Sequence, residues 1–578
     1  MFSFFFLPLQ NNITMEHKTV WSLWERNARN TPDKDAIVHW MAGEEPYRWS
    51  FKELLATANA FSIQLKKQGI KENEVCAIII KHNRMFYPLY MGIVGIGAIP
   101  AVLAYPNPRL HPDKFRDGIR GMSHRSGLDW IFTERSLEPI LSPLLVDSTI
   151  HGVQFPFEWD ITERDAVIED ELKITRDNRS GSDAFLLQHS SGTTGLQKPV
   201  LLSNKAVIDH VDNYAEAISF TESDKIVSWL PLYHDMGLIA AYHLPLAFGI
   251  TSVQIDPFEW VLAPVLLLEA ISKEKGTVAW LPNFAYNMMA DKIPDDELEE
   301  VNLESWRLVI NCSEPVRHES HMRFLNRFKG YGFKQSTLSA CYAMAETTYA
   351  VTQTAPGLLP SAIAVDRLQL AQGIVEVIDD PQKARICVSS GLIIKGCQVR
   401  IVDDTRKDVE AGRVGEIAIH SVSMFDCYRN YPEKTAAVLE DGWYYSGDYG
   451  FCYNDEYYII GRKKDIVIVA GNNIYPEDVE DTVSKVEGVI PGRVVAFGAD
   501  DVELGTDVLA VIAETKAESH DDRKHLKVRI QEAGLKNDLA ITRVYLVPSR
   551  WLIKSSAGKP SRNANKERVL QNNDFIVE

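Results

Sequence analysis

The sequence lacks several features that would place the protein in a common class. No apolar run is long enough to cross a bilayer, and the Phe-rich segment at residues 1–10 is likewise too short. This segment also lacks the basic start of a secretory signal peptide. The seven cysteines are scattered without a C-x-x-C pair, and there is no internal repeat. We therefore expect reduced thiols in a cytoplasmic protein without a transmembrane segment.

Basic residues are fewer than acidic residues, with 61 Lys and Arg against 79 Asp and Glu. The 578 residues carry a formal net charge of −18, whereas a general nucleic-acid binder needs a basic face. We therefore expect no nucleic-acid partner, although a local basic docking patch is compatible with this charge.

Residues 1–18 are expected to be a flexible leader or the product of an upstream start codon, since a second methionine follows at Met15. A weak membrane-surface anchor is the alternative for this segment.

What the sequence does contain is the alternation of strand and helix patterns that is typical of a layered α/β domain. Apolar runs at 75–80, 99–103 and 130–132 predict strands, while 51–68 and 86–97 have helical spacing. The charged segment 158–183 has little periodicity, and we expect it to be a surface loop. Beyond residue 475 the pattern predicts a small α+β domain. A chain of this length is too long for one ordinary core, so two or more domains are expected.

A loop rich in hydroxyls and glycine lies between two strands predicted at 184–187 and 200–202. Glycine lets backbone N–H groups approach an anion, while hydroxyls and an ammonium group add donors and positive charge. The composition predicts a phosphate cradle formed by Ser190, Ser191, Gly192, Thr193, Thr194, Gly195 and Lys198. The loop is not the G-x-x-x-x-G-K-[ST] loop of nucleoside triphosphatases. An ordinary polar hairpin turn is the alternative.

Further motifs follow the cradle at 308–316, 341–348, 443–450, 459–465 and 553–562. They contain Asn-Cys-Ser-Glu-Pro, Tyr-Ala-Met-Ala-Glu, Ser-Gly-Asp-Tyr-Gly, Gly-Arg-Lys-Lys-Asp and Ala-Gly-Lys-Pro, in that order. In this order they resemble the motifs of the acyl-adenylate-forming superfamily of AMP-dependent synthetases and ligases. The His-Asp-Met-Gly sequence after Tyr233 and the Tyr-Pro-Glu-Asp sequence from Tyr475 resemble its fatty acyl-AMP ligase branch.

The resemblance implies a large layered α/β N-terminal adenylation domain at 19–463 and a small mobile α+β C-terminal domain at 464–578. It places a hinge at Lys464 and an adenylation lysine, Lys559, in the loop 553–562. The chain between Glu346 and Gly391 is longer than in ordinary acyl-CoA synthetases. The extra part, about 361–385, resembles an insertion that is thought to restrain domain motion and disfavour CoA. A variable surface loop is the alternative for this segment.

The resemblance also implies roles for single residues. The turn at Ser313 would lie against adenine, Tyr342 would stack on adenine, and Asp448 would accept hydrogen bonds from the ribose hydroxyls. Besides the cradle, the implied ATP site consists of Ser313, Glu314, Pro315, Tyr342, Ala343, Met344, Glu346, Thr347, Asp448, Arg462 and Lys559. The implied catalytic residues are Lys559, His234, Thr194 and Glu346, and the implied Mg²⁺ ligands are Glu346 and Thr194. Cys312 and Ala343 stand where the family commonly has glycine.

The acyl pocket is expected around the strand end that precedes the His-Asp-Met-Gly sequence, because ligands of open α/β sheets gather at such an edge. The candidate pocket residues are Trp229, Tyr233, His234, Met236, Trp280, Phe284, Asn311 and Ala340. For Trp280 and Phe284, plain core packing is the alternative.

The function that the resemblance implies is ATP-dependent activation of a carboxylic acid as acyl-AMP, with release of pyrophosphate. Acyl transfer to the phosphopantetheine thiol of an acyl carrier protein would follow. ATP and Mg²⁺ are the implied cosubstrate and cofactor. No enzyme nucleophile is required, which agrees with the lack of an evident triad. A CoA ligase or an amino-acid activator is the first alternative, and a non-catalytic adenylate-binding sensor is the second.

Overall fold

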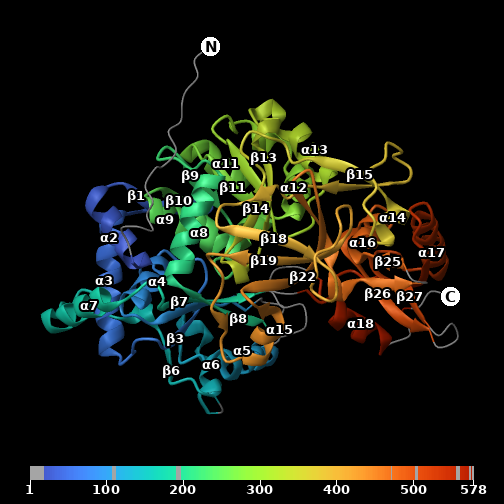
Figure 1. Cartoon of the computed structure of the whole chain (residues 1–578). Helices are drawn as coiled ribbons and strands as arrows, with labels where there is room; N and C mark the ends of the chain where they lie inside the picture. Colours follow the sequence, from blue (N-terminus) through green and yellow to red (C-terminus); the bar gives the residue numbers. More distant parts are fainter. Residues whose placement is uncertain are drawn as a thin grey trace.

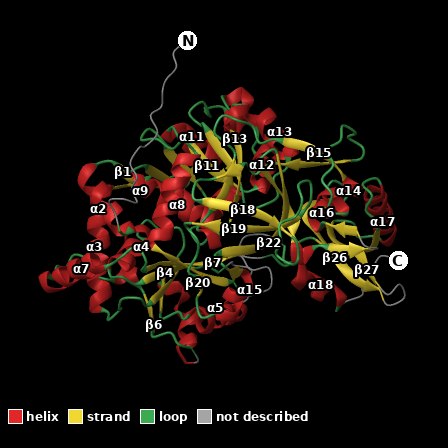
Figure 2. Cartoon of the chain, viewed as in Figure 1, coloured by secondary structure: helices red, strands yellow, loops and turns green. Residues whose placement is uncertain are grey.

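The largest β-sheet has nine strands in the order β17-β14-β13-β12-β11-β9-β10-β1-β2 (Figures 1 and 2). The computed structural model describes residues 18–106, 112–146, 148–190, 197–469, 472–501, 506–554, 560–571 and 575. The strands of this sheet are β1 (Asp35–Trp40), β2 (Tyr47–Ser50), β9 (Lys225–Ser228), β10 (Thr251–Ile255), β11 (Val278–Leu281), β12 (Leu308–Asn311), β13 (Leu338–Ala343), β14 (Ala350–Gln353) and β17 (Leu392–Ile393). Neighbouring strands from β13 to β1 are parallel, and the outer pairs are antiparallel. The central strands are almost wholly buried, as expected for parallel strands covered on both faces.

Three further sheets surround the large one. A four-stranded parallel sheet consists of β4 (Ile99–Val102), β3 (Val75–Ile79), β5 (Trp130–Thr133) and β6 (Gly152–Gln154). A three-stranded sheet consists of β20 (Cys427–Tyr428), β8 (Lys198–Ser203) and β7 (Ala184–Ser190). A five-stranded sheet consists of β18 (Cys397–Val402), β19 (Gly415–Ser421), β22 (Trp443–Tyr453), β21 (Leu439–Glu440) and β23 (Glu456–Arg462). The nucleotide motifs of the sequence therefore fall on several sheets that meet.

Helices cover these sheets and begin at polar caps that the sequence provides. The N-cap Ser50 and Glu53 form a capping box at the start of α3, because each side chain accepts from the other residue's backbone N–H. The helices of this part are α2 (Val20–Asn30), α3 (Phe51–Lys67), α4 (Phe86–Gly95), α5 (Pro112–Ser126), α6 (Glu138–Leu141), α7 (Ala166–Asn178), α8 (Asn204–Ala217), α9 (Leu244–Phe248), α10 (Pro257–Leu262), α11 (Val265–Glu274), α12 (Asn283–Lys292), α13 (His318–Phe328) and α15 (Pro432–Val438). The layered α/β architecture is as predicted.

One prediction for this part is wrong, because the segment 158–183 is not a loop throughout. It contains α7, whose first turn is capped by Asp165, the acceptor for the backbone N–H of Ile168 at 3.2 Å. Only Leu172 and Thr175 are fully buried on this helix. Such a narrow apolar stripe within a charged segment gives little periodicity, so the sequence pattern did not reveal the helix.

The last part of the chain has cores of its own. A three-stranded sheet of β26 (Val489–Asp501), β27 (Thr506–Thr515) and β28 (Ile541–Pro548) packs with the helices α16 (Pro476–Ser484), α17 (His520–Leu535) and α18 (Arg562–Leu570). These elements lie together at one side of the molecule (Figure 1). The apolar clusters on the two faces of this sheet contain no residue before Ile474. This arrangement is the small α+β domain that the sequence predicted.

Two short antiparallel pairs complete the fold. The hairpin β15 (Ala362–Asp366) and β16 (Ala384–Val388), joined through α14 (Arg367–Ala371), is formed by the predicted insertion. The pair β24 (Val467–Val469) and β25 (Asn472–Ile474) connects the large part to the small one. Among the described residues, we find no helix with the length and apolar character that crossing a membrane would require.

Candidate active site

The strands β7 and β8 bring the two ends of the predicted phosphate cradle together. They run antiparallel, with Ser190 opposite Lys198 and His189 opposite Pro199. Strand β8 leads directly into α8, where Ser203 caps the helix by accepting from the backbone N–H of Ala206 at 3.2 Å. The cradle residues Ser191, Gly192, Thr193, Thr194 and Gly195 lie outside the described residues. Their contacts with phosphate and the Mg²⁺ role of Thr194 stay predictions.

The ammonium group of Lys198 is directed at Tyr428. Its Nζ donates to the tyrosine hydroxyl at 3.1 Å and lies 4.8 Å from the centroid of the ring. The same hydroxyl donates to Oε1 of Glu346 at 2.6 Å. Burial lowers the pKa of Lys198, and the negative charge of Glu346 opposes this shift. Two oppositely charged residues that the sequence placed in the site therefore share one neutral hydroxyl.

Glu346 sits on a short 3-10 turn, η8 (Ala345–Thr347), directly after β13. Its carbonyl accepts from the backbone N–H of Phe425 at 2.8 Å, and only 6% of the residue is exposed. The hydroxyl of Thr347 donates to the carbonyls of Met344 at 3.2 Å and Tyr349 at 3.1 Å. In this structure the Thr347 side chain therefore stabilises the turn, and its implied place in the ATP site stays a prediction.

Asp448 is the centre of a second polar cluster. Strands β22 and β23 place it directly opposite Arg462, whose Nε lies 2.9 Å from Oδ1 of the aspartate. The hydroxyl of Tyr342 donates to Oδ2 at 2.6 Å. The Asp448 carboxylate raises the pKa of Arg462, so the guanidinium stays charged. The structure thus gathers Tyr342, Asp448 and Arg462, three residues of the implied ATP site.

The turn predicted to lie against adenine follows β12. Ser313 has a φ of +70°, in the left-handed region that is unfavourable for residues with a Cβ atom. Its hydroxyl is directed at sulfur, with distances of 3.8 Å to Sδ of Met236 and 3.9 Å to Sγ of Cys312. Glu314 accepts from the backbone N–H of Phe284 at 2.9 Å through Oε2. The adenine turn is therefore joined to two residues of the predicted acyl pocket, Met236 and Phe284. The roles of the neighbouring Pro315 and Ala343 in the implied ATP site stay predictions.

Aromatic side chains gather on the acyl side of this turn. Trp229 stacks on Trp260 with centroids 3.6 Å apart and planes at 5°, and Phe284 meets Trp229 edge-on at 6.2 Å. The rings of Tyr233 and His234 are 4.8 Å apart. Directly after them, Met236 begins η4 (Met236–His243), a π-helix of the kind often found at functional sites. Asp235 accepts from the backbone N–H of Met236 at 2.8 Å, which gives it a capping contact.

Three other pocket candidates are buried in the large sheet. Trp280 is fully buried and donates through Nε1 to the Tyr214 hydroxyl at 2.9 Å, which agrees with the core alternative. Nδ2 of Asn311 lies 3.0 Å from Oδ1 of Asn283 and 3.0 Å from Nε2 of His321. Ala340 is opposite Asn311 in the pairing of β12 with β13. Their roles in binding an acyl chain stay predictions.

The predicted hinge, Lys464, lies two residues beyond Arg462, the partner of Asp448. Lys464 is in η9 (Lys463–Asp465), between β23 and β24. Burial lowers its pKa, and the positive charges of Arg462 and Lys198 act in the same direction. Lys559 lies outside the described residues, so its role is a prediction. Three residues beyond Lys559, Arg562 at the start of α18 pairs with Asp465 at 2.6 Å, which connects α18 to η9.

The predicted insertion contacts the small part of the chain. Arg385 on β16 lies 2.9 Å from Asp478 on α16, and Arg367 on α14 lies 3.5 Å from Asp538 after α17. Arg385 also donates to the carbonyl of Ile460 at 3.1 Å. The insertion is therefore an ordered hairpin that joins β23 to the small domain.

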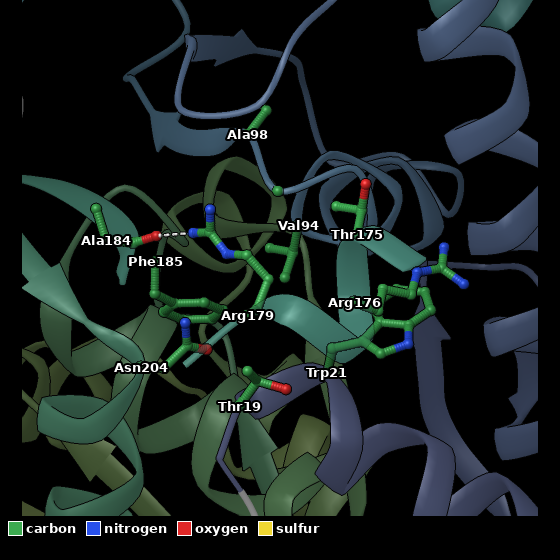
Figure 3. Close-up of a pocket in the computed structure, with 11 residues that line it drawn as sticks. Thr19, Trp21, Val94, Ala98, Thr175, Arg176, Arg179, Ala184, Phe185 and Asn204 are labelled. Carbon is green, nitrogen blue, oxygen red and sulfur yellow. Dashed lines mark hydrogen bonds between the residues drawn. The ribbon is translucent and has the colours of Figure 1, made fainter. Parts of the chain in front are cut away.

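A cavity is lined by residues of α2, α4, α7, β7 and α8 and of the chain beside them (Figure 3). Arg179 points across it and donates to the carbonyl of Ala184 at 2.7 Å. Arg176 lies 3.9 Å from the centroid of the Trp21 ring and donates to Asn59 and to the carbonyl of Gly95. None of the predicted site residues lines this cavity.

Among the described residues, we find no group of three or more His, Cys, Asp and Glu side chains suited to hold a metal ion. Glu346 offers a buried carboxylate that accepts from the neutral hydroxyl of Tyr428. A single carboxylate of this kind suits Mg²⁺ that is otherwise bound by phosphate oxygens and water.

Two residues of the site were missed in the sequence. Tyr428 follows a cysteine in a segment without a recognisable motif. Its hydroxyl contacts Glu346 and Lys198, which are 82 and 230 positions away in the sequence. Trp260 lies in the short helix α10, whose exposed Phe258 and Leu262 obscure any helical stripe. No local pattern pointed to either residue.

Comparison with known proteins gives a consistent picture. Residues 24–429 match the AMP-binding enzyme family. The chain is 29% identical to the medium-chain-fatty-acid–[acyl-carrier-protein] ligase JamA of Moorena producens, covering 90% of each protein. It is 31% identical, over 92% of each protein, to a Caulobacter vibrioides protein that carries an acyl-CoA synthetase name. It is also similar to the crystal structure of a fatty acyl-adenylate ligase from L. pneumophila in complex with acyl adenylate and pyrophosphate. That match has a TM-score of 0.73 and 25% identity, and it covers 98% of both chains.

Proposed function

The chain belongs to the AMP-binding enzyme family, and we propose that it activates a fatty or related carboxylic acid as acyl-AMP with release of pyrophosphate. We further propose that it passes the acyl group to the phosphopantetheine thiol of an acyl carrier protein. The observation that carries the first proposal is the meeting of charged residues from three parts of the fold. Tyr428 joins Lys198 of β8 to Glu346 of the turn after β13, and Tyr342 of β13 bonds Asp448, the partner of Arg462 in the five-stranded sheet.

The chemistry requires two anions to approach each other, because the substrate carboxylate attacks the α-phosphorus of ATP. Catalysis then depends mainly on positioning and on positive charge near the phosphates. In the proposed site, Lys198 and Arg462 supply such charge from the described part of the chain. Lys559 would supply more during adenylation. Asp448 would accept hydrogen bonds from the ribose, and the turn at Ser313 would face adenine.

Mg²⁺ is proposed to enter the site with ATP, next to Glu346. When bound, it would neutralise part of the phosphate charge. Thr194 is the second proposed ligand. His234, beside Tyr233 at the strand end, would lie between the acyl chain and the reacting carboxylate.

The second half-reaction is proposed to follow a rotation of the small domain, 464–578, about Lys464 relative to residues 19–463. The thiol of the carrier attacks the carbonyl carbon of acyl-AMP, a thioester forms, and AMP leaves. A carrier protein is favoured over CoA because JamA is named as a carrier-protein ligase and because Arg385 joins the insertion to Asp478. The C. vibrioides relative supports CoA as the alternative acceptor.

The described cysteines are all free thiols, which supports a cytoplasmic location.

Acid-dependent ATP–pyrophosphate exchange tests the proposed activation step. A panel of carboxylic acids should include at least one that drives exchange, and Glu346→Gln should reduce that exchange. Exchange that needs no acid, or that is absent with fatty, aryl and amino acids alike, contradicts the proposed function.

A further inference from the structure

Tyr428 contacts both of the oppositely charged residues on the phosphate side of the site. Its hydroxyl accepts from Nζ of Lys198 at 3.1 Å and donates to Oε1 of Glu346 at 2.6 Å. The direction of both bonds is fixed, because an ammonium group can only donate and a carboxylate can only accept. One hydroxyl thus uses its proton for Glu346 and a lone pair for Lys198.

The protein holds this hydroxyl firmly in place. Tyr428 is 1% exposed, and its backbone N–H donates to Oγ1 of Thr435 at 3.0 Å. In the pairing of β20 with β8, Tyr428 lies opposite Val200, two residues beyond Lys198. Its ring packs 4.9 Å from that of Phe425, whose own backbone N–H donates to the Glu346 carbonyl. The tyrosine is therefore fixed to the strand that carries Lys198 and to the turn that carries Glu346.

We propose that the Tyr428 hydroxyl is a positioning group that keeps the Lys198 ammonium and the Glu346 carboxylate separate and directed at the phosphates of the bound nucleotide. This role rests on the proposed function of the site. Tyr428 acts through its two neighbours, so it is a positioning residue and not a catalytic one.

The physical reason is the strength of charge attraction in a buried site. Opposite charges attract more strongly there than in water, so without a spacer Lys198 and Glu346 would be drawn into a direct ion pair. Such a pair would have to be broken before the lysine could meet a phosphate or the carboxylate could meet a metal ion. The neutral hydroxyl satisfies one bonding position of each group and leaves their charges uncancelled.

The test is equilibrium binding of ATP to the full chain without any acid substrate, in excess Mg²⁺ and again in EDTA. Tyr428→Phe removes the hydroxyl's hydrogen bonds with Lys198 and Glu346, and it should weaken ATP binding in Mg²⁺ by about tenfold. The loss in EDTA should be smaller, since only Lys198 then faces the phosphates. The matched control is Tyr90→Phe, which removes an equally buried hydroxyl that bonds Nε2 of His243 at 2.8 Å, and it should change neither value.

A double-mutant cycle with Glu346→Gln measures the coupling between Tyr428 and Glu346 in ATP binding. A purely structural role of Tyr428 would not produce this coupling. Tyr428 and Glu346 should be coupled, so that the double variant loses less Mg²⁺-dependent affinity than the two single losses combined. Additive losses, wild-type affinity in Tyr428→Phe, or equal losses in Mg²⁺ and in EDTA would each overturn the proposal. If Tyr428→Phe fails to fold, Thr435→Val, which frees the backbone of Tyr428, takes its place in the same cycle. Acid-dependent exchange by the unaltered protein decides the proposed function independently of this result.

Discussion

Arg462 and Asp448 are direct partners on neighbouring strands, with Nε of the arginine 2.9 Å from Oδ1 of the aspartate. The second oxygen of the same carboxylate accepts from Tyr342 at 2.6 Å. Three sequence motifs therefore meet at one carboxylate, which is 7% exposed. This geometry makes Asp448 the residue whose loss should affect the proposed nucleotide site most directly.

Asp448→Ala should weaken ATP binding by about tenfold or more, because unpaired buried hydrogen-bonding groups cost about 1–3 kcal/mol. The variant leaves Tyr342, Arg462 and the ribose without their common acceptor. Isothermal titration with ATP measures the effect. Asp404→Ala is the control, because Asp404 also pairs with a basic residue, Lys463 at 2.8 Å, but is 77% exposed. Equal nucleotide affinity of Asp448→Ala and the unaltered protein contradicts the role given to Asp448.

Lys559→Ala should lose acyl-AMP formation by about 100-fold or more while it still binds ATP, since a lost charge at the reacting phosphate acts mainly on the transition state. The rate of acyl-AMP formation in a single turnover and the ATP dissociation constant separate the two effects. Lys536→Ala, at an exposed lysine of the same domain, is the control. Unchanged adenylation in Lys559→Ala would remove this lysine from the proposed mechanism.

Arg385→Ala should raise acyl transfer to CoA by about fivefold or more, a typical effect of losing one coupling interaction. The arginine joins the insertion to Asp478 at 2.9 Å, so its removal takes away one of the contacts that restrain the small domain, beside the Arg317–Asp478 pair at 3.5 Å. The matched variant Arg367→Ala breaks a longer contact, 3.5 Å to the half-exposed Asp538, and should have less effect. Acyl-CoA is measured with CoA as the sole thiol. If neither variant differs from the unaltered protein, the insertion does not control acceptor choice.

Stability should fall as the pH is lowered from about 6.5 toward 4. Burial lowers the pKa of His189 and of His82 to about 4, and it lowers the pKa of His210 and of His243 to about 3. In this window the unfolded chain binds protons that the folded chain does not, so the free energy of unfolding decreases with falling pH.

Calorimetric melting temperatures across this range measure the acid effect. His189→Gln should make the dependence shallower, while the exposed His520→Gln should leave it unchanged. A melting temperature that stays constant from pH 6.5 to 4 contradicts the assignment of these histidines as buried and neutral.

The strands and turns that carry the predicted site residues could be predicted because their motifs are local. The strands on either side of the phosphate loop, the turn at Ser313 and the Asp448 strand each follow a short pattern, and the structure has β7, β8, β12 and β22 at those positions. The order of these motifs along the chain also predicted the two-part α/β architecture. The sequence therefore predicted where each of these segments lies in the chain, and the family resemblance predicted the fold that brings them together.

The features that were missed depend on contacts between distant segments. Tyr428 has no local pattern, since its partners are 82 and 230 residues away. The stack of Trp229 on Trp260 likewise joins β9's end to α10 and cannot be inferred from either segment alone. Helix α7 was missed for a different reason, because charged residues cover most of its surface and leave only Leu172 and Thr175 buried. Packing against the rest of the protein, and not local periodicity, sets these features.

The most direct measurement is mass spectrometry of the products formed from ATP, Mg²⁺ and a panel of fatty acids, with a phosphopantetheinylated carrier protein or CoA offered separately. We expect acyl-AMP and pyrophosphate with at least one acid, followed by acyl transfer to the carrier and little transfer to CoA. Efficient acyl-CoA formation would contradict the proposed carrier specificity. Absence of any acyl-AMP across the panel would contradict the central proposal that the protein is an acyl-activating enzyme.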